Sequence, residues 1–262
     1  AGHPVGLGMS QELDSNMMLM SLLYCYGASL QNEDQRPSIN SKATIEALKV
    51  LRDIYKRGMS DEVFAWTAAS NNDAFLAGRL SLAVNAISIR RTAEDRGLAL
   101  ADDTWIAPVP RGPVRRLGNE HVMGIYFIWK FAKNKEAAKQ FLVDQQLGYR
   151  QHFLQSKFYN FPAWTNSIKG GFKTIRRLTN NDRRKPLGQY NILASIAENN
   201  TTNVGYPGYG NAAIGEIWSL YLVPQMFAQV AQGKMTPQEA AKAADRQFKA
   251  IFKKWRDQGL VP

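Results

Sequence analysis

The stretch FAWTAASNNDAFLAGRLSLAVNAISIR, residues 64–90, is the most informative part of this sequence. It opens with Trp66 and the amides of Asn71 and Asn72, continues with the apolar run AFLAG, and ends in an alternating segment that predicts a strand over 81–85. An aromatic ring beside several amides suits a neutral polyhydroxylated ligand, because the ring packs on C–H faces while the amides bond hydroxyls. The same residues are also compatible with a helix, a strand and polar turns that bind nothing.

Five stretches of the chain carry a family resemblance, and they occur in the family's order. The pattern SNN-x-AFLAG-x-x-SL-x-x-N-x-IS resembles the sugar-type family 1 of extracellular solute-binding proteins of ABC importers, which includes maltose-binding protein. The other four stretches are 27–55 with INSKATIEALKVLRDIY, 107–113 with APVPRGP, 132–142 with AKNKEAAKQFL, and 235–251 with MTPQEAAKAADRQFKAI. The similarity extends along nearly the whole chain.

The resemblance implies an α/β fold of the periplasmic-binding-protein type II kind, with two lobes joined by hinge strands. The chain resembles the C-terminal two-thirds of such a protein. We therefore expect residues 1–106 and 160–262 to form the helix-rich second lobe, and 107–159 to be a returning segment of a first lobe that is mostly missing. A shortened protein is one explanation, and a naturally one-lobed protein is the other.

The run MGIYFIWKF, residues 123–131, is almost continuously apolar, which predicts a strand buried on both faces. Its neighbouring strands would belong to the missing part of the first lobe. We therefore expect this apolar surface to be exposed, and to associate with another copy or to remain bound to the missing lobe.

The rest of the chain is mainly helical in its apolar periodicity. The sequence Thr236-x-x-Glu239 followed by an apolar stripe predicts a capping box at the start of the last helix. A strand is expected over 104–107, before Pro108. The predicted helices cover 11–26, 42–56, 72–77, 134–146, 149–155, 168–179, 189–198, 212–232 and 237–258.

The chain is basic, with 33 Lys and Arg against 22 Asp and Glu and a net charge of +11. Such a balance is compatible with nucleic-acid or anionic-membrane binding. However, no nucleic-acid module is recognisable, and the charges are spread along predicted helices, so no nucleic-acid partner is expected. A basic nucleic-acid-associated protein remains the alternative function, and a solute-binding protein for an anionic small molecule is a third.

Catalytic and metal-binding motifs are absent from the sequence. His3, His121 and His152 are far apart, and Cys25 is the single cysteine, so no zinc site with local ligand spacing can be assembled. There is no G-x-S-x-G elbow, phosphate loop or dinucleotide fingerprint. We therefore expect neither an enzyme nor a cofactor nor a metal site.

The family resemblance also implies a set of ligand-binding positions, because its members hold the ligand in a cleft between the lobes. Asn85-Ala86-Ile87-Ser88 stands where the family usually has Asn-Gly-Ile-Ser. Each position also has an ordinary explanation, such as core packing for Trp66 or turn formation for Asn85. The expected ligand-binding residues are Trp66, Asn71, Asn72, Asn85, Ser88, Asn119, Glu120, Trp164, Tyr206 and Tyr209.

As a function, the resemblance implies the substrate-binding component of an ABC importer. Such a protein captures a sugar or polyol and delivers it to a membrane permease. No stretch reaches the roughly 18 consecutive apolar residues of a membrane span, and residues 1–25 lack the basic start of a signal peptide. The implied location is periplasmic or extracellular, with the signal removed, and a membrane anchor in the precursor is compatible with it.

Overall fold

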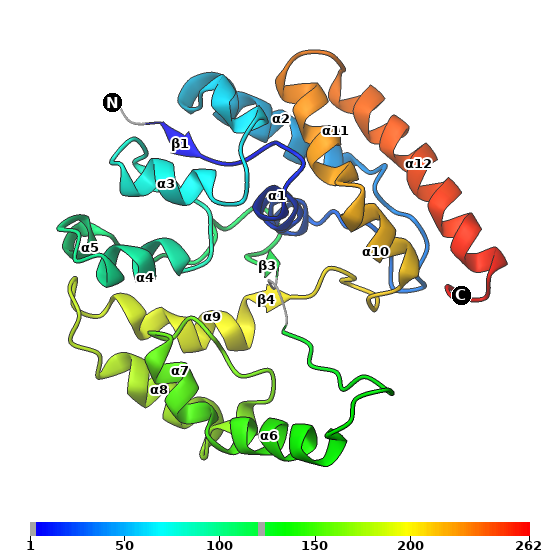
Figure 1. Cartoon of the computed structure of the whole chain (residues 1–262). Coiled ribbons are helices and arrows are strands. Elements are labelled where there is room, and N and C mark those ends of the chain that lie inside the picture. Colours follow the sequence, from blue (N-terminus) through cyan, green and yellow to red (C-terminus); the bar gives the residue numbers. More distant parts are fainter. Residues whose placement is uncertain (1–3, 120–123) are drawn as a thin grey trace. The chain divides into compact units, whose positions relative to one another are not determined.

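The structure is a computed structural model that describes residues 4–119 and 124–262 (Figure 1). Its contacts divide the chain into two compact units. Unit 1 comprises Ala1–Asn85, Pro108–Glu120 and Asn200–Pro262, and unit 2 comprises Ala86–Ala107 and His121–Asn199.

Unit 1 combines long helices with short parallel strand pairs. Its elements, in chain order, are β1 (Val5–Gly6), α1 (Leu13–Tyr26), α2 (Lys42–Gly58), the 3₁₀ helix η1 (Asp61–Phe64), α3 (Ser70–Leu76), β2 (Leu82–Ala83), β3 (Gly118–Asn119), β4 (Thr201–Thr202), α10 (Ala212–Ser219), α11 (Leu222–Ala231) and α12 (Pro237–Asp257).

Helix α1 is the centre of unit 1 and is seen end-on in Figure 1. It is apolar on most sides, with Leu19, Leu23 and Tyr24 fully buried. A helix of this kind has to be enclosed by other elements, and α1 packs against α2, α11 and β3. Glu12 caps its N-terminus by accepting from the backbone nitrogen of Asp14 at 2.6 Å.

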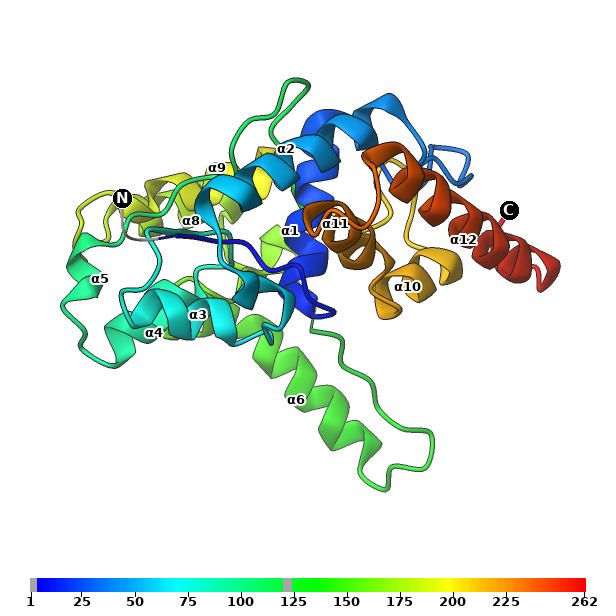
Figure 2. The same ribbon diagram turned by 90° about the horizontal axis from the view of Figure 1, so that it is seen from above.

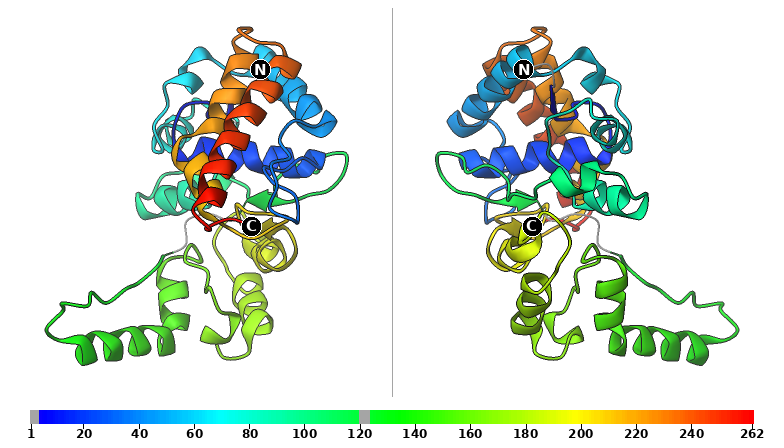
Figure 3. Two further views of the ribbon diagram at one scale, coloured as in Figure 1. Left: turned by 90° about the vertical axis from the view of Figure 1, so that its right-hand side faces the viewer. Right: turned by 90° about the vertical axis from the view of Figure 1, so that its left-hand side faces the viewer.

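Helix α12 covers the outer side of the core and packs along α10 and α11 (Figure 3). The predicted capping box is confirmed, because Thr236 Oγ1 accepts from the Glu239 backbone at 3.2 Å while the Glu239 carboxylate accepts from the Thr236 backbone at 2.9 Å. The predicted helix over 212–232 is interrupted at Tyr221, whose φ of 53° separates α10 from α11. None of the helices in the described part of the chain combines the length and apolar character needed to cross a bilayer.

The strands of unit 1 form two parallel pairs. Val5 and Gly6 of β1 pair with Leu82 and Ala83 of β2, and β3 pairs with β4 in the register Gly118–Thr201 and Asn119–Thr202. The strand expected over 81–85 is therefore present but shorter. The strand expected over 104–107 is wrong, because these residues pair with no described strand; Thr104 instead follows α5 and donates its hydroxyl to the carbonyl of Leu100 at 2.7 Å.

Unit 2 is helical within its described residues. Its elements are α4 (Ser88–Asp95), α5 (Leu100–Asp103), α6 (Lys135–Leu147), α7 (Tyr149–Gln155), η2 (Thr165–Ser167), α8 (Gly171–Asn180), η3 (Gln189–Ile192) and α9 (Leu193–Asn199). Its core is an aromatic cluster in which Phe153, Phe158 and Tyr190 pack with ring centroids 5.0–5.3 Å apart. Helices α4 and α5 were not expected from the sequence.

The strand expected over 123–131 is wrong for its described residues, which have no regular secondary structure; Met123 lies outside the described part. Figure 2 shows this segment running out beside α6 and turning back into it. Phe127, Trp129 and Phe131 are 62–79% exposed, and their rings contact each other along one side, with Trp129 stacked on Phe131 at 5.5 Å. The chain is extended here, but no described segment pairs with it. The expected exposure of this apolar surface is confirmed.

The contact units have different bounds from the expected lobes. Residues 86–106 and 160–199 group with 124–159, although they were expected to group with the rest of the second lobe. Helices α8 and α9 share the aromatic core of α7, which explains this grouping. The assignment of these segments to lobes stays a prediction.

Candidate functional site

Four polar side chains of unit 1 form a hydrogen-bonded group that we name the polar cluster: Asp14, Asn71, Asn72 and Asn85. The amide of Asn71 donates to Asp14 Oδ2 at 3.0 Å, and its oxygen accepts from the Asn72 backbone at 2.7 Å. The Asn85 amide donates to the side-chain oxygen of Asn72. The structure therefore brings together three of the residues expected from the sequence.

Three separate elements position the polar cluster. Asp14 lies in the first turn of α1, the Asn71–Asn72 pair lies in the first turn of α3, and Asn85 follows β2. Helix α3 packs against both β1 and β2, so the end of β2 comes next to the start of α3. The turn before α3 is fixed by Ser70, whose hydroxyl accepts from the Thr67 backbone at 2.9 Å.

The members of the polar cluster differ in accessibility. Asn71 is buried, so its amide serves mainly to orient Asp14. Asp14, Asn72 and Asn85 are half-buried. Carboxylate oxygens accept hydrogen bonds and amides both accept and donate them, which is the combination that a hydroxyl group can use. The cluster therefore offers the kinds of donor and acceptor that a polyhydroxylated molecule uses.

Asp14 is the member of the polar cluster that was not predicted from the sequence. An acidic residue in the first turn of a helix is ordinarily explained by the helix dipole, so its type and position carry no ligand signal. Only the long-range contact with Asn71, 57 residues away, reveals it.

Glu12 lies beside the cluster and is buried. Burial raises the pKa of the Glu12 carboxyl because the charged form loses its water, while hydrogen bonds from Ser15 and from the Asp14 backbone act in the opposite direction. These bonds hold the first turn of α1, and with it the backbone of Asp14, in place.

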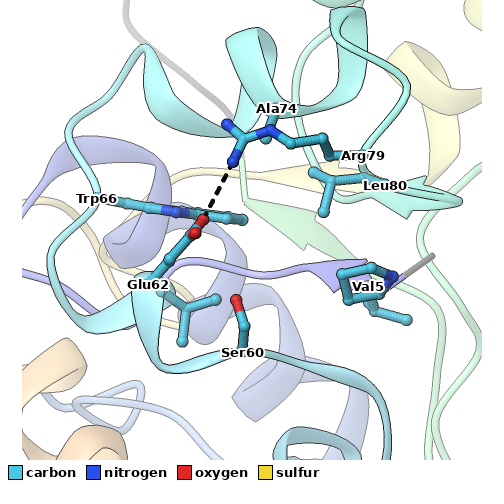
Figure 4. A pocket seen from close by; sticks show the side chains of 9 residues that line it. Val5, Ser60, Glu62, Trp66, Ala74, Arg79 and Leu80 are labelled. Atoms are coloured by element: carbon cyan, nitrogen blue, oxygen red, sulfur yellow. Dashed lines mark hydrogen bonds and ion pairs between the residues drawn. The ribbon is translucent and has the colours of Figure 1, made fainter. Parts of the chain in front are cut away.

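Trp66 is 9% exposed and belongs to the core of unit 1. Its ring lines a cavity of about 250 Å³ whose other walls include Val5 and Leu80, with the Glu62–Arg79 ion pair at 3.4 Å across it (Figure 4). None of the polar-cluster residues lines this cavity. Trp66 is thus separated from the cluster with which it was grouped in the sequence.

The loop GYPGYG, residues 205–210, is anchored by the buried side chain of Gln31. Its amide donates to the carbonyls of Gly205 at 2.7 Å and Tyr209 at 2.8 Å. A Cβ atom at Gly208 would lie 2.8 Å from this amide, so the glycine is needed for the packing of the loop itself. Tyr209 is 80% exposed and available to a ligand.

Tyr206 is held more firmly than Tyr209. Its ring packs edge-on against Tyr24 at 5.5 Å, and Arg115 donates to its hydroxyl.

In β3, the Asn119 backbone donates to Ser21 Oγ at 2.7 Å, while Asn119 Oδ1 is buried with no hydrogen-bond partner among the described residues. This oxygen is an unused acceptor.

The remaining expected residues lie elsewhere. Ser88 begins α4 and Trp164 is an exposed residue before η2, both in unit 2. Glu120 lies outside the described residues, as do His3 and His121. Within 4–119 and 124–262, no three His, Cys, Asp or Glu side chains come together in a group that could hold a metal ion.

The sequence matches no protein-family model and no curated protein. Solved structures, however, are similar over almost all of the chain. An ABC transporter solute-binding protein from Thermotoga lettingae TMO, bound with α-D-tagatose, is 17% identical with a TM-score of 0.72, over 95% of this chain and 59% of that one.

Two further structures agree with it. A sugar transporter protein from Arthrobacter chlorophenolicus A6 with bound laminaribiose is 15% identical with a TM-score of 0.71, over 95% of this chain and 61% of its own. An ABC transporter solute-binding protein from Agrobacterium radiobacter K84 in complex with ribitol is 15% identical with a TM-score of 0.70, over 95% of this chain and 60% of its own. The chain thus spans about 60% of the length of these proteins, and over that length it has the fold of the ABC sugar-binding proteins, the periplasmic-binding-protein type II fold.

Proposed function

We propose that the chain is the solute-binding component of an ABC importer and that it binds a neutral sugar or polyol. The observation that supports this most is the shared fold, since the similar structures were solved with a ketose, a disaccharide and a sugar alcohol. The polar cluster supports it independently, because it offers acceptors and donors without a nucleophile or a metal site.

In this proposal the polar cluster forms hydrogen bonds with the hydroxyl groups of the ligand. Asn72 and Asn85 donate and accept, and Asp14 accepts through Oδ1, which has no hydrogen-bond partner among the described residues. Asn119, with its unused Oδ1, and the exposed ring of Tyr209 are further proposed ligand-binding groups of unit 1. Ser88, Glu120 and Trp164 stay predictions from the family resemblance. Trp66 and Tyr206 pack in and against the core of unit 1.

We infer the physiological role from the proteins that share this fold. The loaded protein delivers its solute to a membrane permease, and the location is periplasmic or extracellular. These parts of the proposal rest on the role of the similar proteins as transport components.

Calorimetric titration of single variants with the sugar that binds the intact chain tests the site. Asn72→Ala and Asn85→Ala each remove hydrogen bonds worth roughly 0.5–1.5 kcal/mol, so each should weaken binding by about two- to tenfold. Asn181→Ala is the control, because Asn181 is exposed at the end of α8. Unchanged affinity in both cluster variants, with binding otherwise intact, would remove the polar cluster from the site.

A further inference from the structure

Unit 2 contains a cavity that the sugar-binding proposal does not use. Its volume is about 440 Å³, within the range of roughly 300–1,000 Å³ that is usual for small-molecule sites. Its charged lining is mainly basic: Arg90, Lys157, Arg184 and Lys185 face the carboxylates of Glu94 and Asp102.

The Glu94 carboxylate in the cavity wall is already fully engaged. Arg90 Nε lies 3.0 Å from its Oε1, and Arg184 Nη1 donates to Oε2 at 2.8 Å. The hydroxyl of Tyr190 donates to Oε1 at 2.6 Å, and the Glu94 side chain is almost inaccessible to water. This one carboxylate therefore has little capacity left to balance the other cations.

Arg90 has a buried donor that no described residue uses. Its side chain is 3% exposed, and Nη2 donates to the carbonyl of Lys185. Nη1 is buried and has no hydrogen-bond partner among the described residues. A buried charged donor without an acceptor is costly, so an acceptor brought in by a ligand would be favoured here.

The other cations differ in how far they are neutralised. Lys157 lies 2.6 Å from Asp95, and Arg184 lies 2.9 Å from Asp182. Lys185 is exposed and forms no ion pair with the described residues. The exposed Asp102 is screened by water and salt. Lys185 consequently has an unbalanced charge, and Arg90 has an unused donor.

We propose that this cavity is a second ligand site, which binds a small molecule through an oxyanion such as a phosphate or carboxylate group. The exposed Lys185 supplies the positive charge that attracts the anion, and the buried Arg90 supplies the free Nη1 donor. The site belongs to unit 2 alone, so it does not depend on sugar binding at the polar cluster of unit 1.

Calorimetric titrations of the intact chain with glucose 6-phosphate, inorganic phosphate and glucose test this proposal at constant ionic strength. We expect glucose 6-phosphate to bind more tightly than glucose. Lys185→Gln should weaken its binding by about tenfold, since hydrogen bonds to charged groups are among the strong ones. Arg183→Gln is the matched control, because Arg183 is an exposed neighbour that does not line the cavity.

Three results would overturn the proposal: no binding of either phosphate compound, equal binding of glucose and glucose 6-phosphate, or equal loss in the Lys185 and Arg183 variants. The last would mean that diffuse surface charge attracts the anion. Binding of inorganic phosphate that is lost in Lys185→Gln supports the oxyanion site. The Lys185→Gln variant is also titrated with a neutral sugar. Unchanged affinity for that sugar would show that the loss of anion binding concerns the cavity of unit 2 and not the proposed sugar-binding function.

Discussion

Asn71 and Asn72 are neighbours of the same type, yet their environments give them different roles. Asn71 is buried and orients Asp14, whereas Asn72 is half-buried and accepts from Asn85. The sequence indicated that this segment carries amides suited to hydroxyl groups. It could not indicate the division of roles, because Asn71 finds its partner Asp14 in a segment that is 57 residues away in the chain.

Glu12 gives a pH-dependence prediction at the residue scale. Burial raises the pKa of its carboxyl in the folded state, so the folded protein takes up this proton more readily than the unfolded chain. The stability contributed by Glu12 is therefore greatest at low pH and decreases as pH rises through that pKa. Relative to Glu12→Gln, the free energy of unfolding of the wild-type chain should fall as pH rises above 4.5, the ordinary pKa of a glutamate.

Urea denaturation of both proteins across this range measures the difference. Because Gln cannot titrate, all other groups cancel in the comparison. A difference that stays constant, or that grows in favour of the wild type as pH rises, would show that Glu12 is not held in an environment that penalises its charge.

At the scale of elements, the sequence predicted the helices more accurately than the strands. Helices α2, α7 and α12 begin at Lys42, Tyr149 and Pro237, where caps and periodicity predicted them. These signals are local, so one segment contains all of them. A strand exists only when a second segment pairs with it, and for this reason 104–107 and 124–131 have strand-like composition without forming a ladder.

The capping box of α12 supplies the prediction at this scale. Thr236→Ala removes the acceptor for the Glu239 backbone, 3.2 Å away, and should lower the free energy of unfolding by about 1 kcal/mol. Thr236→Ser keeps the hydroxyl and is the control. Denaturation curves for the three proteins measure the effect, and an alanine variant as stable as the serine variant would show that the cap contributes nothing.

At the scale of the whole molecule, the family resemblance predicted the fold, which the similar solved structures bear out. The bounds of the contact units were not predicted. They depend on which helices share a core, as α7, α8 and α9 do, and periodicity within one helix does not reveal its partner. Asp14 was missed for the same reason, because it joins the polar cluster through a contact between distant segments.

The exposed aromatic segment gives a prediction at this scale. Phe127, Trp129 and Phe131 present one continuous apolar surface, so the chain should bind a fluorescent hydrophobic dye in its native state. A Phe127→Ser/Trp129→Ser/Phe131→Ser variant should bind clearly less dye. The control is Phe227→Ser in the core of unit 1, which shows how much dye the chain binds when its core is destabilised.

Equal dye binding by the wild type and the triple variant would contradict this exposure. Self-association through the same surface stays a prediction, and light scattering on the wild type and the triple variant tests it.

The central claim is that the chain binds a neutral polyhydroxylated solute, and one measurement tests it most directly. The intact chain is titrated calorimetrically with a panel of neutral monosaccharides, disaccharides and sugar alcohols, at low and at high salt. We predict saturable binding of at least one of them, with an affinity that hardly changes with salt because no phosphate charge is neutralised. Absence of binding to every neutral compound, together with salt-sensitive binding of nucleic acid, would contradict the account.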